Sequence, residues 1–322
     1  MVFYQLRIYM TLYLIVPCYN EEECLQDSAD KLLKKYEALK AAGKIDDKSK
    51  IVLVNDGSKD NTAKIAHSIH EAHSEFSCIN FSKNFGHQCA VLAGYMFAID
   101  KCDCAISIDA DLQQDINAID LFLDDFKNGS EIVYGVRNSR DTDGFFKKLT
   151  SQMFYKLMQI FGCKIISNHA DYRLLSNKAL KALAEYKETN VFLRGLIPTL
   201  GFKSSIVYFD VFDRTAGKSK YNLSKMMRLA MDGITSFSIN PIHYVFYAGV
   251  ISFIVSIGFM IYTLIDHFLG HTVSGWSTIV ISIWLLGGLQ LIAIGVIGEY
   301  IGKNYIESKR RPRYIIDTVE HE

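Results

Sequence analysis

Two carboxylates and an amide stand close together at the end of an apolar run in this chain. Asp109 and Asp111 flank a single alanine directly after residues 105–108, and Gln113 follows. Carboxylate and amide oxygens are hard ligands that suit Mg²⁺ or Mn²⁺ bound together with phosphate. An alternative is that Asp111 caps a helix that starts near Asp115. The position at the end of a buried run favours the metal, so we predict a metal site of Asp109, Asp111 and Gln113.

Three further polar clusters each follow an apolar run. They are Tyr19-Asn20-Glu21, Asn55-Asp56-Gly57-Ser58 and Ser82-Lys83-Asn84. One polar loop would be unremarkable, since loops are generally polar. In a parallel sheet, however, the ligand site lies outside the carboxyl ends of the strands. The four clusters together therefore predict a single pocket.

The elements that must position this pocket alternate along the chain. Short apolar runs read as buried parallel strands, and the stretches between them have apolar residues near helical spacing. The predicted strands are residues 12–16, 50–54, 77–81, 105–108 and 132–134, and the predicted helices are residues 24–42, 61–72 and 88–99. This order predicts an α/β fold with a mostly parallel, Rossmann-like sheet and helices on both faces.

Composition excludes several classes of protein. The 322 residues include 35 basic and 35 acidic side chains, and this balance argues against a nucleic-acid binder. The seven cysteines match no zinc or redox spacing. The chain also has no phosphate-binding P-loop, no Gly-x-Gly-x-x-Gly dinucleotide motif and no Gly-x-Ser-x-Gly nucleophile motif.

Two long apolar stretches follow the α/β part. Residues 244–265 and 276–298 contain no Lys, Arg, Asp or Glu, and each is long enough to cross a hydrocarbon core of about 30 Å. The alternative, two buried helices of a soluble core, is disfavoured by this length. The loop between them lacks Lys and Arg, whereas the segment after them is basic, so the positive-inside rule places the catalytic part and both termini in the cytoplasm.

These observations divide the chain into four parts. We expect a catalytic domain over residues 1–221, a juxtamembrane segment over 222–243, two transmembrane helices within 244–300 and a basic cytoplasmic tail over 301–322. Residues 223–237 alternate basic and apolar side chains, which predicts an amphipathic helix at the membrane surface or, alternatively, an ordinary surface helix. Glycines at 287, 288, 295 and 298 would permit close helix contact in a homo-oligomer.

The motifs, taken together, resemble a known family. Val16-Pro-Cys-Tyr-Asn-Glu-Glu, Val54-Asn-Asp-Gly-Ser and Asp109-Ala-Asp-Leu-Gln resemble family 2 glycosyltransferases, which have the A-type nucleotide-sugar fold. Further motifs are similar to the polyprenyl-phosphate branch, which includes dolichyl-phosphate mannose synthase and the bactoprenol glucosyltransferases. These motifs are Ser82-Lys-Asn-Phe-Gly-His, Tyr134-Gly-Val-Arg, Ala170-Asp-Tyr-Arg-Leu, Phe192-Leu-Arg-Gly-Leu, Gly217-Lys-Ser-Lys-Tyr and Asp232-Gly-Ile-Thr-Ser-Phe-Ser. Two positions depart from the family: Asn55, where Asp is usual, and Ala170-Asp-Tyr-Arg in place of Gly-Asp-Phe-Arg.

The resemblance implies roles for particular residues. Donor binding is expected from Pro17, Tyr19, Glu21, Asp56, Lys83, Asn84 and Asp109. Contacts to phosphate, sugar or acceptor are expected from Arg137, Lys148, Ser151, Arg173, Arg214 and Lys218. Asp109, Asp111 and Asp171 are the expected catalytic residues. Asp171 would act either as a base or by orienting a substrate.

The resemblance also implies a reaction. A sugar would pass, with inversion, from a nucleoside diphosphate sugar to a membrane polyprenyl phosphate such as undecaprenyl phosphate, with Mg²⁺ or Mn²⁺. The product would serve cell-envelope glycan modification. UDP-glucose is the first expectation, and GDP-mannose, UDP-galactose and UDP-N-acetylglucosamine remain open. A processive polysaccharide synthase is an alternative, although its Gln-x-x-Arg-Trp motif is absent. A non-catalytic membrane scaffold is the other alternative, which the intact acidic motif disfavours.

Overall fold

The computed structural model describes residues 9–138, 169–189, 191–210, 240–269 and 275–321. The chain forms two compact units. The first contains residues 1–155, 164–222 and 312–322, and the second contains residues 156–163 and 223–311. The C-terminal residues therefore belong to the same unit as the N-terminal part of the chain.

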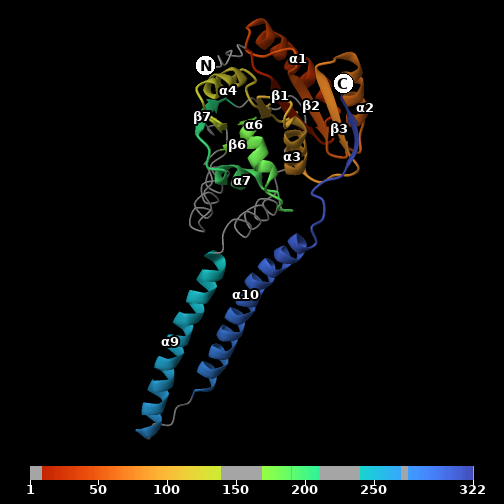
Figure 1. The fold of residues 1–322 in the computed structure, drawn as a ribbon. Helices are drawn as coiled ribbons and strands as arrows, with labels where there is room; N and C mark the ends of the chain where they lie inside the picture. Colours follow the sequence, from red (N-terminus) through yellow and green to blue (C-terminus); the bar gives the residue numbers. More distant parts are fainter. Residues whose placement is uncertain (1–8, 139–168, 190, 211–239, 270–274, 322) are drawn as a thin grey trace. The chain divides into compact units, whose positions relative to one another are not determined.

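One mixed sheet runs through the first unit (Figure 1). Its eight strands lie in the order β7-β5-β6-β4-β1-β2-β3-β8. The strands are β1 (Leu12–Cys18), β2 (Lys50–Asn55), β3 (Phe76–Phe81), β4 (Cys104–Ser107), β5 (Ile132–Arg137), β6 (His169–Ser176), β7 (Ser204–Phe209) and β8 (Ile316–Glu320). β4, β1, β2 and β3 are mutually parallel neighbours, β5 and β7 pair in parallel, and β6 and β8 pair antiparallel with their neighbours. The predicted, mostly parallel α/β sheet is confirmed.

The helices cover the sheet as the alternating pattern predicts. They are α1 (Leu25–Ala41), α2 (Thr62–Ala72), α3 (His87–Ala98), α4 (Ala118–Lys127), α6 (Asn177–Ala184) and α7 (Leu193–Thr199). α3 packs closely on β1, because a Cβ at Gly94 would lie only 2.1 Å from Ile15 Cγ2. Helices that connect parallel strands run antiparallel to them, so α3 begins at the carboxyl edge of the sheet. Its first residues, His87 and Gln88, thus lie where the polar clusters were predicted.

The central strands form because their sequences are nearly continuous apolar runs. All seven residues of β1 are buried, as are all four of β4, which fits central strands covered on both faces. The five predicted strands are confirmed, with β5 running on to Arg137. β6, β7 and β8 are additional strands that the sequence analysis did not predict.

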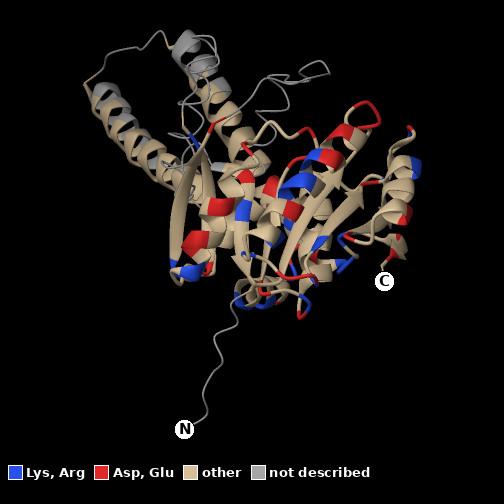
Figure 2. Ribbon diagram, turned by 90° about the horizontal axis from the view of Figure 1, so that it is seen from above, with Lys and Arg blue, Asp and Glu red and all other residues tan. Residues whose placement is uncertain are grey.

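The second unit contains two long helices, α9 (Asn240–Phe268) and α10 (Trp276–Ser308). Figure 2 shows Lys, Arg, Asp and Glu spread over the elements of the sheet-containing unit. By length and composition, one described stretch, Leu285–Ser308, is apolar and long enough to cross a membrane. The segment predicted as a basic tail, 301–322, contains the end of α10 and the strand β8.

Candidate active site

The loops after β1 and β2 are tied together at the carboxyl edge of the sheet. The Asn20 backbone N–H donates to Ser58 Oγ over 3.0 Å, and the Lys59 N–H donates to Asn20 Oδ1 over 2.9 Å. The Glu21 N–H donates to Thr62 Oγ1 over 2.9 Å. Two of the predicted polar clusters are therefore brought together, as expected for ends of adjacent parallel strands.

Asp56 is enclosed by the loop after β3, residues 82–86. Its carboxylate accepts from Asn84 Nδ2 over 3.0 Å, from the Phe85 N–H over 2.6 Å and from the Gly86 N–H over 2.9 Å. Asp56 is only 2% exposed, and this burial raises the pKa of its carboxyl while the two backbone N–H groups counteract the rise. Asp56 thus holds the 82–86 loop, and its expected part in donor binding stays a prediction.

Gly57 allows this loop to come close. Its φ of +61° lies in the left-handed region, and a Cβ there would lie 2.2 Å from the Lys83 carbonyl carbon. The clashing atoms belong to the backbone, so a change of side-chain rotamer cannot relieve the clash. The residue next to Asp56 must therefore be glycine for the loop to close on it.

Asp171, on β6, is the centre of an ion-pair cluster. Arg194 Nε lies 3.1 Å from Asp171 Oδ1 and Arg194 Nη2 lies 2.8 Å from Asp171 Oδ2, while Arg173 pairs with Oδ1 from beneath. Burial raises the pKa of Asp171, but the Arg194 and Arg173 guanidiniums outweigh it and hold that pKa well below its ordinary range. The carboxylate is therefore ionised at neutral pH.

His87 links this cluster to the acidic motif. Its Nε2 lies 3.6 Å from Asp109 Oδ1 and 3.7 Å from Asp171 Oδ2. The His87 side chain is 42% exposed and that of Asp109 is 35% exposed, so both are open to a ligand. Two acids from different strands, β6 and the end of β4, thus face one imidazole.

Asp109 has a second neighbour that the sequence analysis did not select. Gln114 Nε2 donates to Asp109 Oδ2, while Gln114 Oε1 is buried without a hydrogen-bond partner among the described residues. Asp111 Oδ1 accepts from the Gln113 backbone N–H over 3.3 Å.

This donor set fits a divalent cation. Two carboxylates and an unpaired amide oxygen are hard ligands, and Mg²⁺ is usually held by one or two carboxylates plus substrate phosphates. Among the described residues, no three His, Cys, Asp or Glu side chains are arranged so that they alone could hold a metal ion, so phosphate oxygens would have to complete the coordination. The metal site of Asp109, Asp111 and Gln113 stays a prediction.

The other predicted site residues lie in different settings. Pro17 is buried in β1, Tyr19 is 38% exposed and Lys83 is exposed at the loop. Arg137 is half-buried at the end of β5, and Arg173 is fully buried and paired with Asp171. The contacts of both with phosphate, sugar or acceptor stay predictions. Lys148, Ser151, Arg214, Lys218 and the amphipathic segment 223–237 lie outside the described residues.

The sequence analysis missed His87, Gln88, Gln114 and Arg194 as site residues. His87 and Arg194 belong to motifs that carried the family resemblance, so the motifs held a signal for them. Gln88 joins two elements of the site: its Nε2 lies 3.4 Å from Asp171 Oδ2 and its Oε1 accepts from the Leu193 N–H over 3.2 Å. This bridging role depends on distant segments and has no local sequence pattern.

The chain is similar to known proteins over most of its length. The family described as "Glycosyl transferase family 2" matches residues 13–184, which include the clusters at the ends of β1 to β4 and Asp171. Uncharacterized glycosyltransferase YkoT of Bacillus subtilis is 47% identical over 95% of this chain and 91% of its own length. Bactoprenol glucosyl transferase of Shigella phage SfV is 38% identical over 95% of this chain and 98% of its own length.

Two further matches were found. The prophage bactoprenol glucosyl transferase homolog of Escherichia coli is 37% identical over 97% of this chain and 100% of its own length. Among solved structures, mannosyltransferase PcManGT from Pyrobaculum calidifontis, in complex with GDP-Man and Mn²⁺, is 15% identical with a TM-score of 0.49. That match covers 71% of this chain and 64% of that chain.

Proposed function

The chain belongs to glycosyl transferase family 2, and we propose that it moves a sugar from a nucleoside diphosphate sugar to the phosphate of a membrane polyprenol. The observation that carries the proposal is the convergence of Asp109 and Asp171 on His87 at the carboxyl edge of the sheet. The bactoprenol glucosyl transferases matched over nearly their full length support undecaprenyl phosphate as the acceptor and glucose as the sugar. UDP-glucose is accordingly the proposed donor.

The donor would bind against the loops after β1, β2 and β3. Tyr19 and Glu21 lie on the first of these loops, and the 82–86 loop is fixed by Asp56. Asp109 and Asp111, with Gln113, would hold a divalent cation. When bound, that cation would neutralise charge that develops on the diphosphate leaving group.

The acceptor needs little help from a base. A phosphate monoester has a second pKa of about 6, so its attacking oxygen is mostly ionised at neutral pH. Asp171 is held ionised by two guanidiniums and would be a weak base. We therefore assign it an orienting role: it fixes Arg194 and faces His87 beside the reacting groups. Direct attack opposite the leaving group would invert the anomeric centre.

The proposed acceptor and the path of the chain both support attachment to a membrane. β7 ends at Phe209 and β8 begins at Ile316, and both strands belong to one sheet, so they lie on one side of any membrane. The segment between them must therefore cross an even number of times. If Leu285–Ser308 spans the bilayer, a second crossing is required, and α9, with 29 residues and a length of about 43 Å, is long enough.

This parity supports a two-pass protein of the cell membrane with its catalytic unit in the cytoplasm. The exposed apolar side chains along both helices support the same topology. They include Phe246, Ile251, Ile254, Leu285, Leu291 and Ile294. The two alternatives considered from the sequence, a processive synthase and a non-catalytic scaffold, gain no support from the site.

Transfer of a labelled sugar tests the proposal. Membranes that contain the full chain are incubated with undecaprenyl phosphate and, in parallel, with labelled UDP-glucose, UDP-galactose, UDP-N-acetylglucosamine and GDP-mannose. We expect the glucose label to enter the lipid fraction, and we expect Asp109→Asn to reduce this incorporation strongly at the same Mg²⁺ concentration. Label in a polymer would favour the processive synthase, and no incorporation from any donor would contradict the proposal.

A further inference from the structure

Residues 313–318 follow α10 and return to the sheet-containing unit, where they contact Phe81, Ser82 and Tyr186, which lead into two segments of the candidate active site. We propose that this segment, here called the tail strap, is a positioning element that fixes two active-site loops for sugar transfer. One loop is 82–86, which encloses Asp56, and the other leads into α7 and Arg194. The kinetic part of the proposal rests on the proposed function, and the structural part stands without it.

The tail strap supports the 82–86 loop through rings and one backbone bond. The Tyr314 ring stacks on the Phe81 ring with centroids 5.2 Å apart and planes 8° apart. Phe81 in turn meets Phe85 edge-on with centroids 5.8 Å apart. The Ser82 N–H donates to the Ile315 carbonyl over 3.1 Å. The Phe85 N–H donates to Asp56, so these ring contacts connect Tyr314 to the carboxylate that the 82–86 loop encloses.

A chain of side-chain hydrogen bonds joins the tail strap to the turn after β2. Asn80 Nδ2 donates to Thr318 Oγ1, and Asn55 Nδ2 donates to Asn80 Oδ1, each over 3.0 Å. Asn55 Oδ1 then accepts from the Ser58 N–H over 3.1 Å. An aspartate at position 55 would have no N–H group to donate to Asn80 Oδ1. The asparagine at this position therefore completes a connection from Thr318 to the Asp56-Gly57-Ser58 turn.

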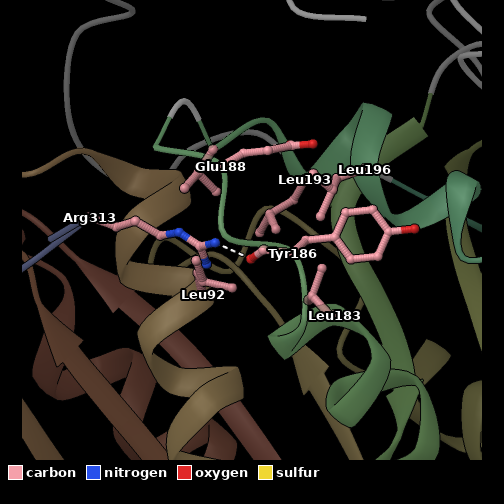
Figure 3. Close-up of a pocket in the computed structure, with 8 residues that line it drawn as sticks. Leu92, Leu183, Tyr186, Glu188, Leu193, Leu196 and Arg313 are labelled. Atoms are coloured by element: carbon pink, nitrogen blue, oxygen red, sulfur yellow. Dashed lines mark hydrogen bonds between the residues drawn. The ribbon is translucent and has the colours of Figure 1, made fainter. Parts of the chain in front are cut away.

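Arg313 supports the opposite side of the site. Figure 3 shows its guanidinium directed at the Tyr186 carbonyl, which accepts a hydrogen bond from it. Apolar side chains of α3, α6 and α7 surround this contact: Leu92, Leu183, Leu193 and Leu196. Beyond it, the Leu193 N–H donates to Gln88, and the adjacent Arg194 holds Asp171. The chain that carries Arg194 is thus anchored on Arg313 at one end and on Gln88 and Asp171 at the other.

The way the tail strap uses its side chains separates it from an ordinary edge strand. It uses two consecutive side chains, Arg313 and Tyr314, on different loops, and each loop carries a group that faces the site. Asp317, in the same strand, is exposed. The strap therefore offers substitutions on each loop and a matched control. Loss of the Tyr314 stack should make the 82–86 loop more mobile. Loss of the Arg313 side chain should make the segment that leads into α7 and Arg194 more mobile.

The test uses the full chain in lipid nanodiscs with Tyr314→Ala, Tyr314→Phe, Arg313→Ala and the control Asp317→Ala. Hydrogen exchange is followed in the peptides around Phe85 and around Leu193, and KM and kcat are measured with nucleotide sugar and polyprenyl phosphate. We expect Tyr314→Ala to speed exchange around Phe85 and to raise the donor KM about two- to tenfold, with Tyr314→Phe restoring both. Arg313→Ala should speed exchange around Leu193 and lower kcat, and Asp317→Ala should change neither.

The outcomes separate the two proposals. Unchanged exchange at both loops in Tyr314→Ala and Arg313→Ala would overturn the tail strap, as would kinetic losses that Asp317→Ala shares. A wild-type chain that transfers no sugar would contradict the proposed function, while the exchange measurements would still decide whether the strap holds the loops.

Discussion

Arg194 grips both carboxylate oxygens of Asp171 from a position 23 residues further along the chain. The two contacts, 3.1 Å and 2.8 Å, form the parallel, two-pronged pairing that a guanidinium makes with a carboxylate. Arg173 completes the cluster from inside the protein, where it is fully buried. Asp171 is therefore an anion held in place, and it positions the guanidinium groups of both Arg194 and Arg173.

Removing the Arg194 side chain should slow catalysis more than it destabilises the fold. The Arg194 side chain is 30% exposed, and Arg194→Ala leaves Asp171 paired with the buried Arg173 and next to Gln88 and His87. We expect kcat/KM to fall about 10- to 100-fold, the effect of losing a charged hydrogen bond. Arg194→Lys should not restore it, because a lysine cannot form two parallel bonds. Lys187→Ala, a nearby surface cation, is the control, and an equal loss there would contradict a specific role.

Neutralising Asp171 should destabilise the whole domain. Asp171→Asn leaves the buried Arg173 guanidinium without its anion, and breaking a buried pair typically costs about 3–5 kcal/mol. The free energy of unfolding in urea measures this loss. Asp27→Asn removes an exposed pair with Lys31 and should change stability by less than about 1 kcal/mol. Similar values for both variants would show that the Asp171 cluster adds little.

The acid side of the pH–rate profile should reflect the acceptor phosphate rather than Asp171. Burial raises the Asp171 pKa, but Arg194 and Arg173 hold it well below 3.8. Its stabilising charge is therefore fully present above about pH 4 and is lost only as pH falls through the lowered pKa. kcat/KM measured from pH 5 to 9 should decline below about pH 6, where the phosphate gains a proton. Constant kcat/KM down to pH 5 would contradict this assignment.

Substituting Gly57 should displace the 82–86 loop. An added Cβ would meet the Lys83 and Asn84 backbone at 2.2 and 2.6 Å. Gly201→Ala is the matched control, because Gly201 also has a positive φ, +68°, but open space around it. The control isolates backbone strain of about 1–2 kcal/mol. We expect Gly57→Ala to lose nucleotide binding in calorimetry and Gly201→Ala to retain it; equal affinities would disprove the clash.

Removing divalent cations should abolish sugar transfer. EDTA treatment followed by dialysis should leave no activity, and added Mg²⁺ or Mn²⁺ should restore it. Asp109→Asn and Asp111→Asn should raise the cation concentration required for half-maximal activity, since each removes a charged ligand. Gln26→Ala, on the surface of α1, serves as control. Full activity in EDTA would exclude the predicted metal site.

The central part of the fold could be predicted because the residues of each central strand are themselves enough to identify it. β1, β2 and β4 are short apolar runs, each buried on both faces, and each ends in polar residues that the parallel order brings to one edge. The polar clusters after β1, β2 and β3 lie close together, as predicted, and hydrogen bonds join them. Asp109 could be predicted as a site residue because it ends an apolar run, and Asp171 because it belongs to a motif of the family.

The missed features depend on distant partners. β8 reads Ile-Asp-Thr-Val-Glu and is largely exposed, so its sequence does not stand out from an ordinary polar tail. It becomes a strand because β3 supplies an edge for it. Arg194 and Gln114 likewise gain their roles from Asp171 and Asp109, and no periodicity in their own neighbourhoods indicates these pairs.

The pairing of β8 with β3 also imposes a delay on the newborn protein. Asn80 and Thr318 are 238 residues apart, and a ribosome that adds about 5–20 residues per second needs roughly 12–48 s to make the intervening chain. During that time β3 presents unpaired backbone groups, a surface that can join another chain. If α9 and α10 insert into a membrane as proposed, β3 keeps this open edge until they have been made and inserted, and slow insertion would lengthen the time in which another chain can pair with it.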